Sequence, residues 1–312
     1  MRVGILGSLT DGGGRSPIDA YVEELAQMRD EGFRRMWTSQ LPFDPDLMTV
    51  LVVALREVDT IEVATGVLPI QVQHPMQLAQ RALTVSLIGG GRFILGLGMS
   101  HRMVTEEMWG IPWDKPVRRL SEYLDGLLPL LAGQPANAVG ETVTTRGALR
   151  IPGAPTPPVY IAALGPQMLR LAGRRSAGTI TWMTGPKTLA GHIGPTLREA
   201  AAEAGRPDGA VQVAAALPVS VTDDVESARA LAAEQFAMYG HLPSYRAMLD
   251  REGFAGPEDA ALIGDEQTVS DRIAELRNAG VDEFVGIAFD TSPEGRARTR
   301  GLMRRHDDSD GS

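Results

Sequence analysis

Eight short apolar runs, each followed by a longer stretch with helical spacing, constrain the fold of this chain more than any other feature. The runs are residues 3–7, 35–38, 61–66, 93–96, 159–162, 179–182, 211–216 and 283–288. Strands that alternate with helices pair in parallel, and eight of them in 312 residues favour a closed barrel. The sequence therefore predicts an α/β fold, a (β/α)8 TIM barrel with small insertions.

Two segments interrupt the alternation. Residues 134–150 alternate apolar and polar positions at period two, which predicts a small hairpin outside the barrel. Residues 240–260 are rich in turn formers and are expected to be an irregular excursion. Neither has enough apolar residues for a core of its own, so we expect a single domain over residues 1–305. The polar, acidic residues 306–312 are expected to be a disordered tail.

Composition excludes several classes of protein. The net charge is −9 with no basic cluster, which argues against nucleic acid and anionic membrane as partners. No apolar run approaches the ~20 residues of a membrane span, and no signal peptide is visible. The chain has no cysteine, and its five histidines lack the spacing of a metal site. No phosphate-binding P-loop and no G-x-S-x-G elbow is present. We therefore expect a cytoplasmic protein that acts on a small molecule without a metal.

The third expected strand ends in Gly66-Val67-Leu68-Pro69, and His74-Pro75 precedes the next helix. Proline at the first position of a helix is an ordinary feature and explains Pro75 completely. It does not explain the long connection over residues 68–73. A glycine at the end of a barrel strand lets the backbone approach a flat ligand, so a structural and a functional interpretation both stand here.

The fourth expected strand ends in two glycines, Gly96 and Gly98, and is followed by Ser100 and His101. Without side chains at this strand end, a ring can lie against the backbone. The loop lies at the carboxyl end of a strand, which is the functional face of a barrel. A loop histidine is more often a structural hydrogen-bonding residue than a catalyst, so both roles remain open for His101.

Further candidates follow the other strands. Strand five runs into a helix that has Pro166 in its first turn, where free backbone N–H groups favour an anion such as phosphate. The alternative is an ordinary strand-to-helix junction. The residues singled out at these strand ends and in the loop after strand four are Ser39, Gln40, Trp109, Ala163, Leu164, Gly165, Gln167, Met168, Met183 and Thr184.

These features together resemble the bacterial-luciferase-like superfamily of barrel oxidoreductases. The resemblance rests on GVLPIQVQHPMQLAQRALTVSLIGGGRFILGLGMSH, on PVYIAALGPQMLRLAGRRSAGTI and on GDEQTVSDRIAELRNAGVDEF. It spans residues 2–300, and the first block is specific. The sequence GLGMSH followed by MWGIPWDKPVRRLSEYLDGLLPLLAG is most similar to the branch that uses the deazaflavin coenzyme F420 in place of FMN.

The resemblance implies where the cofactor binds. The deazaflavin is expected to lie against a bulge at Gly66, Val67 and Leu68, where the family often has a non-prolyl cis peptide. Gly98, Ser100 and His101 are expected to flank the ring. Ala163, Leu164, Gly165, Gln167 and Met168 are expected to surround the ribityl phosphate, with backbone N–H groups as donors. The family also suggests a homodimer.

The chain departs from one branch of the superfamily. In the sugar-phosphate dehydrogenase branch an Asp-His pair ends strand two and a glutamate follows the strand-four glycines. This chain has Ser39-Gln40 and His101 at those positions, so that proton relay does not carry over.

The leading hypothesis is an F420-dependent oxidoreductase that transfers a hydride between C5 of the deazaflavin and a small organic substrate. In this hypothesis His101 and Gln40 are the catalytic candidates. Ser39 orients the ring or the substrate, and Trp109, Met183 and Thr184 are the candidates for substrate contact. The alternatives are an FMN-dependent monooxygenase and a barrel that binds the cofactor without turnover.

Overall fold

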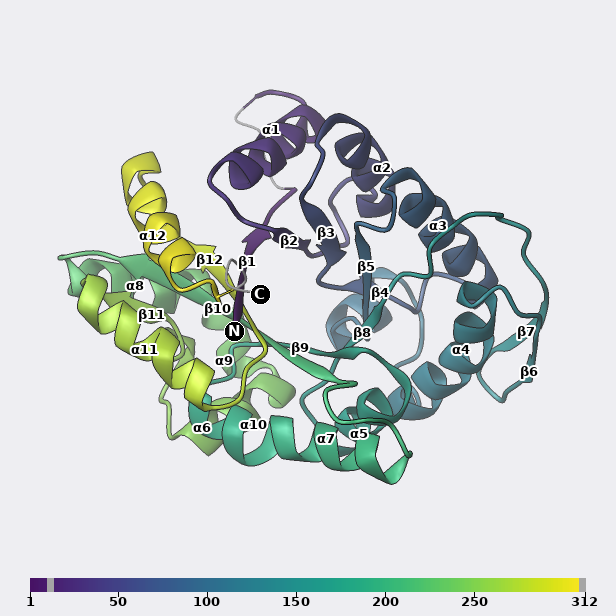
Figure 1. Ribbon diagram of the computed structural model, residues 1–312. Coiled ribbons are helices and arrows are strands. Elements are labelled where there is room, and N and C mark those ends of the chain that lie inside the picture. The colour runs from purple at the N-terminus through teal and green to yellow at the C-terminus, as the bar shows by residue number, and fades with distance from the viewer. Residues whose placement is uncertain (10–13, 309–312) are drawn as a thin grey trace. The chain divides into compact units, whose positions relative to one another are not determined.

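The computed structural model describes residues 1–9 and 14–308. The chain divides into two compact units. We call residues 7–27 and 36–162 the N-terminal unit, and residues 1–6, 28–35 and 163–312 the C-terminal unit. Figure 1 labels the elements of both.

The N-terminal unit is built on parallel strands. Strand β3 (Glu62–Thr65) pairs with β5 (Phe93–Gly98), and β5 pairs with β8 (Val159–Ala162) and with the short β4 (Leu68–Pro69). The remaining elements are α1 (Pro17–Asp30), β2 (Arg35–Thr38), α2 (Leu47–Glu57), α3 (Pro75–Ile88), the π-helix η1 (Val104–Met108), α4 (Pro116–Leu131), β6 (Ala136–Val139) and β7 (Thr144–Gly147). Buried aromatic rings fill the core, where Trp37 meets Tyr160 edge to face at 5.4 Å between ring centres.

The C-terminal unit is also built on parallel strands. Strand β10 (Gln212–Val221) pairs with β9 (Gly178–Trp182), β11 (Leu262–Gly264) and β12 (Glu283–Ala288), and β12 pairs with β1 (Arg2–Gly7). The helices are α5 (Pro166–Arg175), α6 (Pro186–Thr188), the π-helix η2 (Leu189–Ile193), α7 (Gly194–Glu203), α8 (Val225–Gln235), α9 (Ala237–His241), α10 (Pro243–Glu252), the 3-10 helix η3 (Pro257–Asp259), α11 (Glu266–Asn278) and α12 (Pro293–Arg305).

Parallel strands alternate with helices in both units, and the chain has the (β/α)8 barrel fold that the alternation predicted. The predicted hairpin over residues 134–150 is also confirmed, because β6 and β7 pair antiparallel. It lies against α4, as Figure 1 shows. Gly126 of α4 allows this close approach, since a Cβ there would lie 2.3 Å from Thr145 Oγ1.

Some expectations about the elements were wrong. The excursion over residues 240–260 contains α10, which is a regular helix. Strand β5 continues to Gly98, two residues beyond the expected run over residues 93–96, and ends in the two glycines as predicted. His306, Asp307 and Asp308 were expected in a disordered tail, but His306 Nε2 lies 3.0 Å from Ser270 Oγ and Asp308 binds the N-terminal ammonium at 2.8 Å. Residues 309–312 lie outside the described part. The prediction of a single domain remains a prediction.

Candidate functional site

A bulge between β3 and β4 forms the centre of the candidate site in the N-terminal unit. The Gly66–Val67 peptide is cis, as the resemblance implied. The end of β2 holds this bulge: Gly66 N donates to Thr38 O at 2.7 Å, and Ser39 Oγ donates to Gly66 O at 2.5 Å. Gln40 N donates to Val67 O at 3.4 Å. The bulge is therefore tied to the preceding strand by three hydrogen bonds on both sides of the cis peptide.

The two glycines of β5 make room for this bulge. A Cβ on Gly96 would lie 1.8 Å from Thr65 O, and one on Gly98 would lie 2.6 Å from Val67 Cγ2. Thr65 Oγ1 also accepts from Gly96 N and donates to Gly96 O, both at 2.8 Å. The expectation that Gly98 leaves bare backbone for a ring is therefore wrong in its geometry, because the Val67 side chain occupies that space. A ligand that reached this strand end would meet the bulge first.

The Gln40 side chain is bound to its own loop. Its Nε2 donates to Leu41 O at 2.8 Å and to Pro45 O at 3.3 Å, and its Oε1 accepts from Leu47 N at 2.7 Å. These contacts fix the loop after β2 against the first turn of α2. A direct catalytic role for Gln40 stays a prediction.

The loop after β5 carries Ser100 and His101, both half-buried. The backbone N–H of Ser100 donates to Gln71 Oε1 at 3.4 Å, and Gln71 Nε2 lies 3.9 Å from Met99 Sδ. Burial lowers the pKa of His101 below its ordinary value of 6.5, so the imidazole is neutral at pH 7. A neutral imidazole offers one N–H donor and one acceptor nitrogen.

His101 also anchors the start of the following loop. Its carbonyl accepts from Thr105 N at 3.0 Å and from Thr105 Oγ1 at 3.1 Å. The π-helix η1 follows and ends at Met108, and the backbone N–H of the next residue, Trp109, donates to Val104 O at 3.2 Å. Single π-turns are frequent at functional sites. Trp109 is half-buried, and its contact with substrate stays a prediction.

In the C-terminal unit, the N-terminus of α5 is open. Ala163 is buried, whereas Gly165 and Gln167 are exposed, and no side chain caps the helix. A Cβ on Gly165 would meet nothing within 4 Å. The N–H groups of Gln167 and Met168 lie in the first turn, where the helix dipole favours an anion. The carbonyl of Leu164 beside them is paired with His192 Nε2 at 2.9 Å.

Two other substrate candidates are buried in the C-terminal unit. Met183 and Thr184 are fully buried, and Thr184 Oγ1 donates to Trp182 O at 3.1 Å. Trp182 contacts Phe236 and Tyr239 edge to face, at 5.9 and 5.7 Å between ring centres. The role of Met183 and Thr184 in substrate binding stays a prediction.

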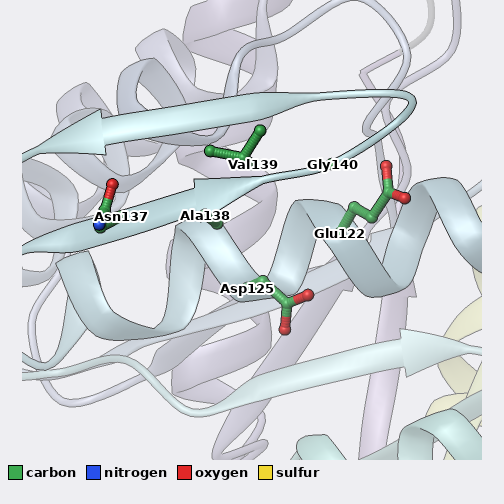
Figure 2. Close-up of a pocket in the computed structure, with 6 residues that line it drawn as sticks. All are labelled: Glu122, Asp125, Asn137, Ala138, Val139 and Gly140. Carbon is green, nitrogen blue, oxygen red and sulfur yellow. The ribbon is translucent and has the colours of Figure 1, made fainter.

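A surface hollow of about 490 Å³ lies elsewhere in the N-terminal unit. Figure 2 shows it between α4, which contributes Glu122 and Asp125, and strand β6 with Gly140 beyond it. Glu122 Oε2 is already bound by Thr142 N and Oγ1, at 2.7 and 2.6 Å. The hollow includes no strand end of the candidate site, so we assign no chemistry to it.

Two features are absent from residues 1–9 and 14–308. No group of three or more histidine, aspartate and glutamate side chains is arranged to hold a metal ion. No helix there has both the length and the apolar character that crossing a membrane requires.

Sequence reasoning missed several residues that shape the site. Gln71, in the loop after β4, accepts a hydrogen bond from Ser100 N. Gln73, in the same loop, binds Arg81 and Pro69 O. The alternation Gln71-Val72-Gln73-His74 was the available signal, because two amides two residues apart in an otherwise apolar segment are unusual. His192 gave no signal, since a π-turn brings it to Leu164.

The family model for the luciferase-like monooxygenases matches residues 1–283. The chain belongs to this family. Among its relatives, a 5,10-methylenetetrahydromethanopterin reductase of Methanolobus tindarius is 29% identical over 213 residues, which cover 68% of this chain and 64% of the relative.

Solved structures of similar fold include members with different cofactors. The coenzyme F420-dependent tetrahydromethanopterin reductase of Methanopyrus kandleri matches this luciferase-like chain with a TM-score of 0.76 and 23% identity, over 97% of each chain. The oxygenating constituent of 3,6-diketocamphane monooxygenase from Pseudomonas putida, in complex with FMN, matches with a TM-score of 0.78 and 20% identity, over 98% of this chain and 97% of the other. At these identities the likeness establishes the barrel fold.

Proposed function

We propose that this protein is an F420-dependent oxidoreductase that transfers a hydride between C5 of the deazaflavin and a small organic substrate. The observation that carries the proposal is the similarity to the methylenetetrahydromethanopterin reductase, together with the GLGMSH segment that resembles the F420 branch. A deazaflavin, when bound, supplies two-electron hydride chemistry. The protein then has to bind and orient the cofactor and the substrate, and to exclude water from them.

Each unit, taken by itself, has a feature that suits one part of such a cofactor. In the N-terminal unit the cis bulge of Gly66, Val67 and Leu68 is fixed from behind by Ser39, and Ser100 lies beyond it on the next loop. In the C-terminal unit the uncapped N-terminus of α5 at Gly165 offers N–H donors to a phosphate. The bulge suits the ring of a deazaflavin, and the helix N-terminus suits a phosphate.

We assign proton transfer in this reaction to His101. Because burial keeps its imidazole neutral near pH 7, its N–H can polarise an acceptor oxygen and its other nitrogen can take up a proton. Ser39 and Gln40 are bound to backbone atoms, so we assign them to orientation of the bulge and its loop.

The specific alternative is FMN-dependent monooxygenation, which the fold shared with the FMN-bound monooxygenase supports. A second alternative is a barrel that binds the cofactor without turnover. Titration of the apo-protein with F420 and with FMN, monitored by cofactor fluorescence, distinguishes the F420-dependent oxidoreductase from the FMN-dependent monooxygenase. We expect tight binding of F420 and weak binding of FMN, and the opposite order would overturn the choice of cofactor.

The catalytic assignment has its own test. His101→Ala should reduce F420H2-dependent turnover while leaving the dissociation constant of F420 nearly unchanged. Unchanged turnover would remove His101 from the mechanism. Binding of F420 without hydride transfer to any acceptor in a broad panel would favour the non-catalytic barrel.

We further propose that the protein acts in the cytoplasm as a homodimer on a small molecule, without nucleic acid or membrane partners. The proposal follows the family resemblance and the net charge of −9. Sedimentation equilibrium measures the mass directly, and a monomer at micromolar concentration would contradict it.

A further inference from the structure

A charged side chain outside the proposed site connects two of its loops. Arg81 lies on α3, and its Nη2 donates to both carboxylate oxygens of Asp46, at 2.7 and 2.6 Å. Its Nη1 donates to Gln73 Oε1 at 2.8 Å. Asp46 ends the loop after β2, and Gln73 belongs to the loop after β4. We call Asp46, Arg81 and Gln73 the loop brace.

The first end of the loop brace fixes the loop that carries Ser39 and Gln40. Asp46 caps α2 by accepting from Thr49 N at 2.9 Å and from Thr49 Oγ1 at 2.6 Å. Burial alone would raise the pKa of Asp46, but the hydrogen bonds from Thr49 and Arg81 lower it below its ordinary value. The carboxylate is therefore charged at neutral pH and binds both partners.

The second end of the loop brace reaches the strand that follows the bulge. Gln73 Nε2 donates to Pro69 O at 3.2 Å, and Pro69 ends β4 directly after Val67 and Leu68. The amide thus receives Arg81 on its oxygen and holds β4 with its nitrogen. Helix α2, which Asp46 caps, and helix α3, which carries Arg81, lie side by side in Figure 1. One end of the loop brace therefore binds β4 at Pro69 O, and the other end caps α2 at the end of the loop that carries Ser39 and Gln40.

The energetics indicate what such a contact can do. The Arg81 side chain is 30% exposed and that of Asp46 is 49% exposed. Exposed ion pairs add little to the free energy of unfolding, because water already solvates both charges and the side chains lose entropy. The planar guanidinium is, however, a rigid fork that sets the direction of both partners. A contact of this kind is therefore better suited to fixing the position of its partners than to adding overall stability.

We propose that Arg81 is a positioning residue for the cofactor site, which sets the loop after β2 and the loop after β4 at the separation that the ring requires. The inference rests on the proposed function, because it concerns the ring-binding bulge. It differs from that proposal in naming a residue that touches neither cofactor nor substrate.

The test combines two substitutions that break the loop brace from different residues. Arg81→Met and Gln73→Met each remove the Arg81–Gln73 contact with little change in side-chain volume. The matched control is Arg298→Met, because Arg298 binds Glu266 through two 2.7 Å hydrogen bonds at similar exposure, 37% and 45%, and touches neither loop. The readouts are the F420 dissociation constant, the unfolding midpoint, and amide hydrogen exchange in residues 38–46 and 66–73.

We expect Arg81→Met to weaken F420 binding about tenfold, as removal of a supporting residue around a site typically does. Exchange in both loops should become faster, and the unfolding midpoint should change no more than in Arg298→Met. Arg81→Lys should recover only part of the affinity, because an ammonium cannot form the fork. The double variant with Gln73→Met should bind F420 no worse than the poorer single variant, since both break one linkage.

Two results would overturn the inference. One is an F420 dissociation constant that is the same in Arg81→Met and wild type. The other is additive loss of affinity in the double variant together with a midpoint lowered well beyond the Arg298→Met control. If the wild-type protein does not bind F420, the proposed function fails instead. Slow loop exchange in wild type and fast exchange in both loop-brace variants would then still separate the positioning role from the choice of cofactor.

Discussion

The contact between Gly98 and the bulge makes a quantitative prediction. Gly98→Ala introduces a Cβ that would lie 2.6 Å from Val67 Cγ2 and 3.3 Å from Ala162 Cβ. Both distances are shorter than ordinary carbon contacts, and the β-branched Val67 has few rotamers into which to move. Overpacking of this kind costs about 1–3 kcal/mol in unfolding free energy. Because the nearest atom is a single methyl group, we expect a cost of about 1–2 kcal/mol.

The second substitution in this prediction removes the clash. Val67→Ala deletes the methyl group that meets the new Cβ, so Gly98→Ala should cost much less in that background. The expected coupling between the two positions is about 1 kcal/mol, within the range for residues in direct contact. Urea unfolding of the four proteins gives the free energies, and equal slopes against urea concentration show that the same transition is compared.

Gly96→Ala provides the comparison, because the atom in its way is Thr65 O of the backbone at 1.8 Å. A carbonyl of a paired strand cannot rotate aside, so this variant should lose more stability than Gly98→Ala, and Val67→Ala should not rescue it. Additive free energies for Gly98→Ala and Val67→Ala would refute the idea that Gly98 exists to admit the Val67 side chain. Equal costs for Gly96→Ala and Gly98→Ala would refute the distinction between backbone and side-chain contacts.

Three further predictions concern other residues of the site. Because burial lowers the pKa of His101 in the folded protein, the unfolded chain takes up a proton first as the pH falls below 6.5, and stability is lost in that window. His101→Gln should flatten this part of the curve of unfolding free energy against pH, and parallel curves would contradict the reasoning. Gly165→Asp should fold normally, since the space around Gly165 is open. It should bind F420 more weakly than Gly165→Asn does, because a carboxylate repels phosphate, and calorimetric titration measures the affinity of both variants. His192 should be protonated on Nε2, since its partner is a carbonyl, and nitrogen NMR shifts of the ring would reveal the other tautomer if it were present.

Local pattern was sufficient for most of the fold. The expected runs at 35–38, 159–162 and 283–288 coincide with β2, β8 and β12, because each is a short apolar segment bounded by polar or turn-forming residues. Helix α10 was missed because only Met248, Leu249 and Glu252 of its ten residues are buried, which leaves almost no apolar periodicity. Strand β4 has two residues, too few for any periodic signal.

The positions of the candidate residues at the strand ends could be predicted from the sequence, but the contacts that their side chains make could not. The carboxyl ends of parallel strands meet at one edge, so the positions of Ser39, Gly66 and His101 along the chain were enough to select them. That Gly98 faces Val67 depends on the register between β4 and β5, which sequence spacing does not reveal. Likewise, Arg81 reads as an ordinary polar position of α3 until the fold brings Asp46 to it.

The polar side chains around the bulge divide into two kinds, and this division identifies where proton chemistry can occur. Ser39 and Gln71 form hydrogen bonds to the backbone of neighbouring loops, and Gln40 forms them to the backbone of its own loop, so these side chains determine geometry. Of the two proposed catalytic residues, His101 and Gln40, only His101 has a titratable side chain, and burial lowers its pKa below the ordinary value and so favours the neutral imidazole. Loss of Ser39 Oγ should therefore change how a ring binds, whereas loss of the His101 imidazole should change how a proton moves. This division predicts that Ser39→Ala raises the F420 dissociation constant and leaves turnover at saturating F420 intact. It predicts that His101→Ala lowers turnover and leaves the dissociation constant unchanged. The same response from both variants would show that orientation and proton transfer reside in one group of residues.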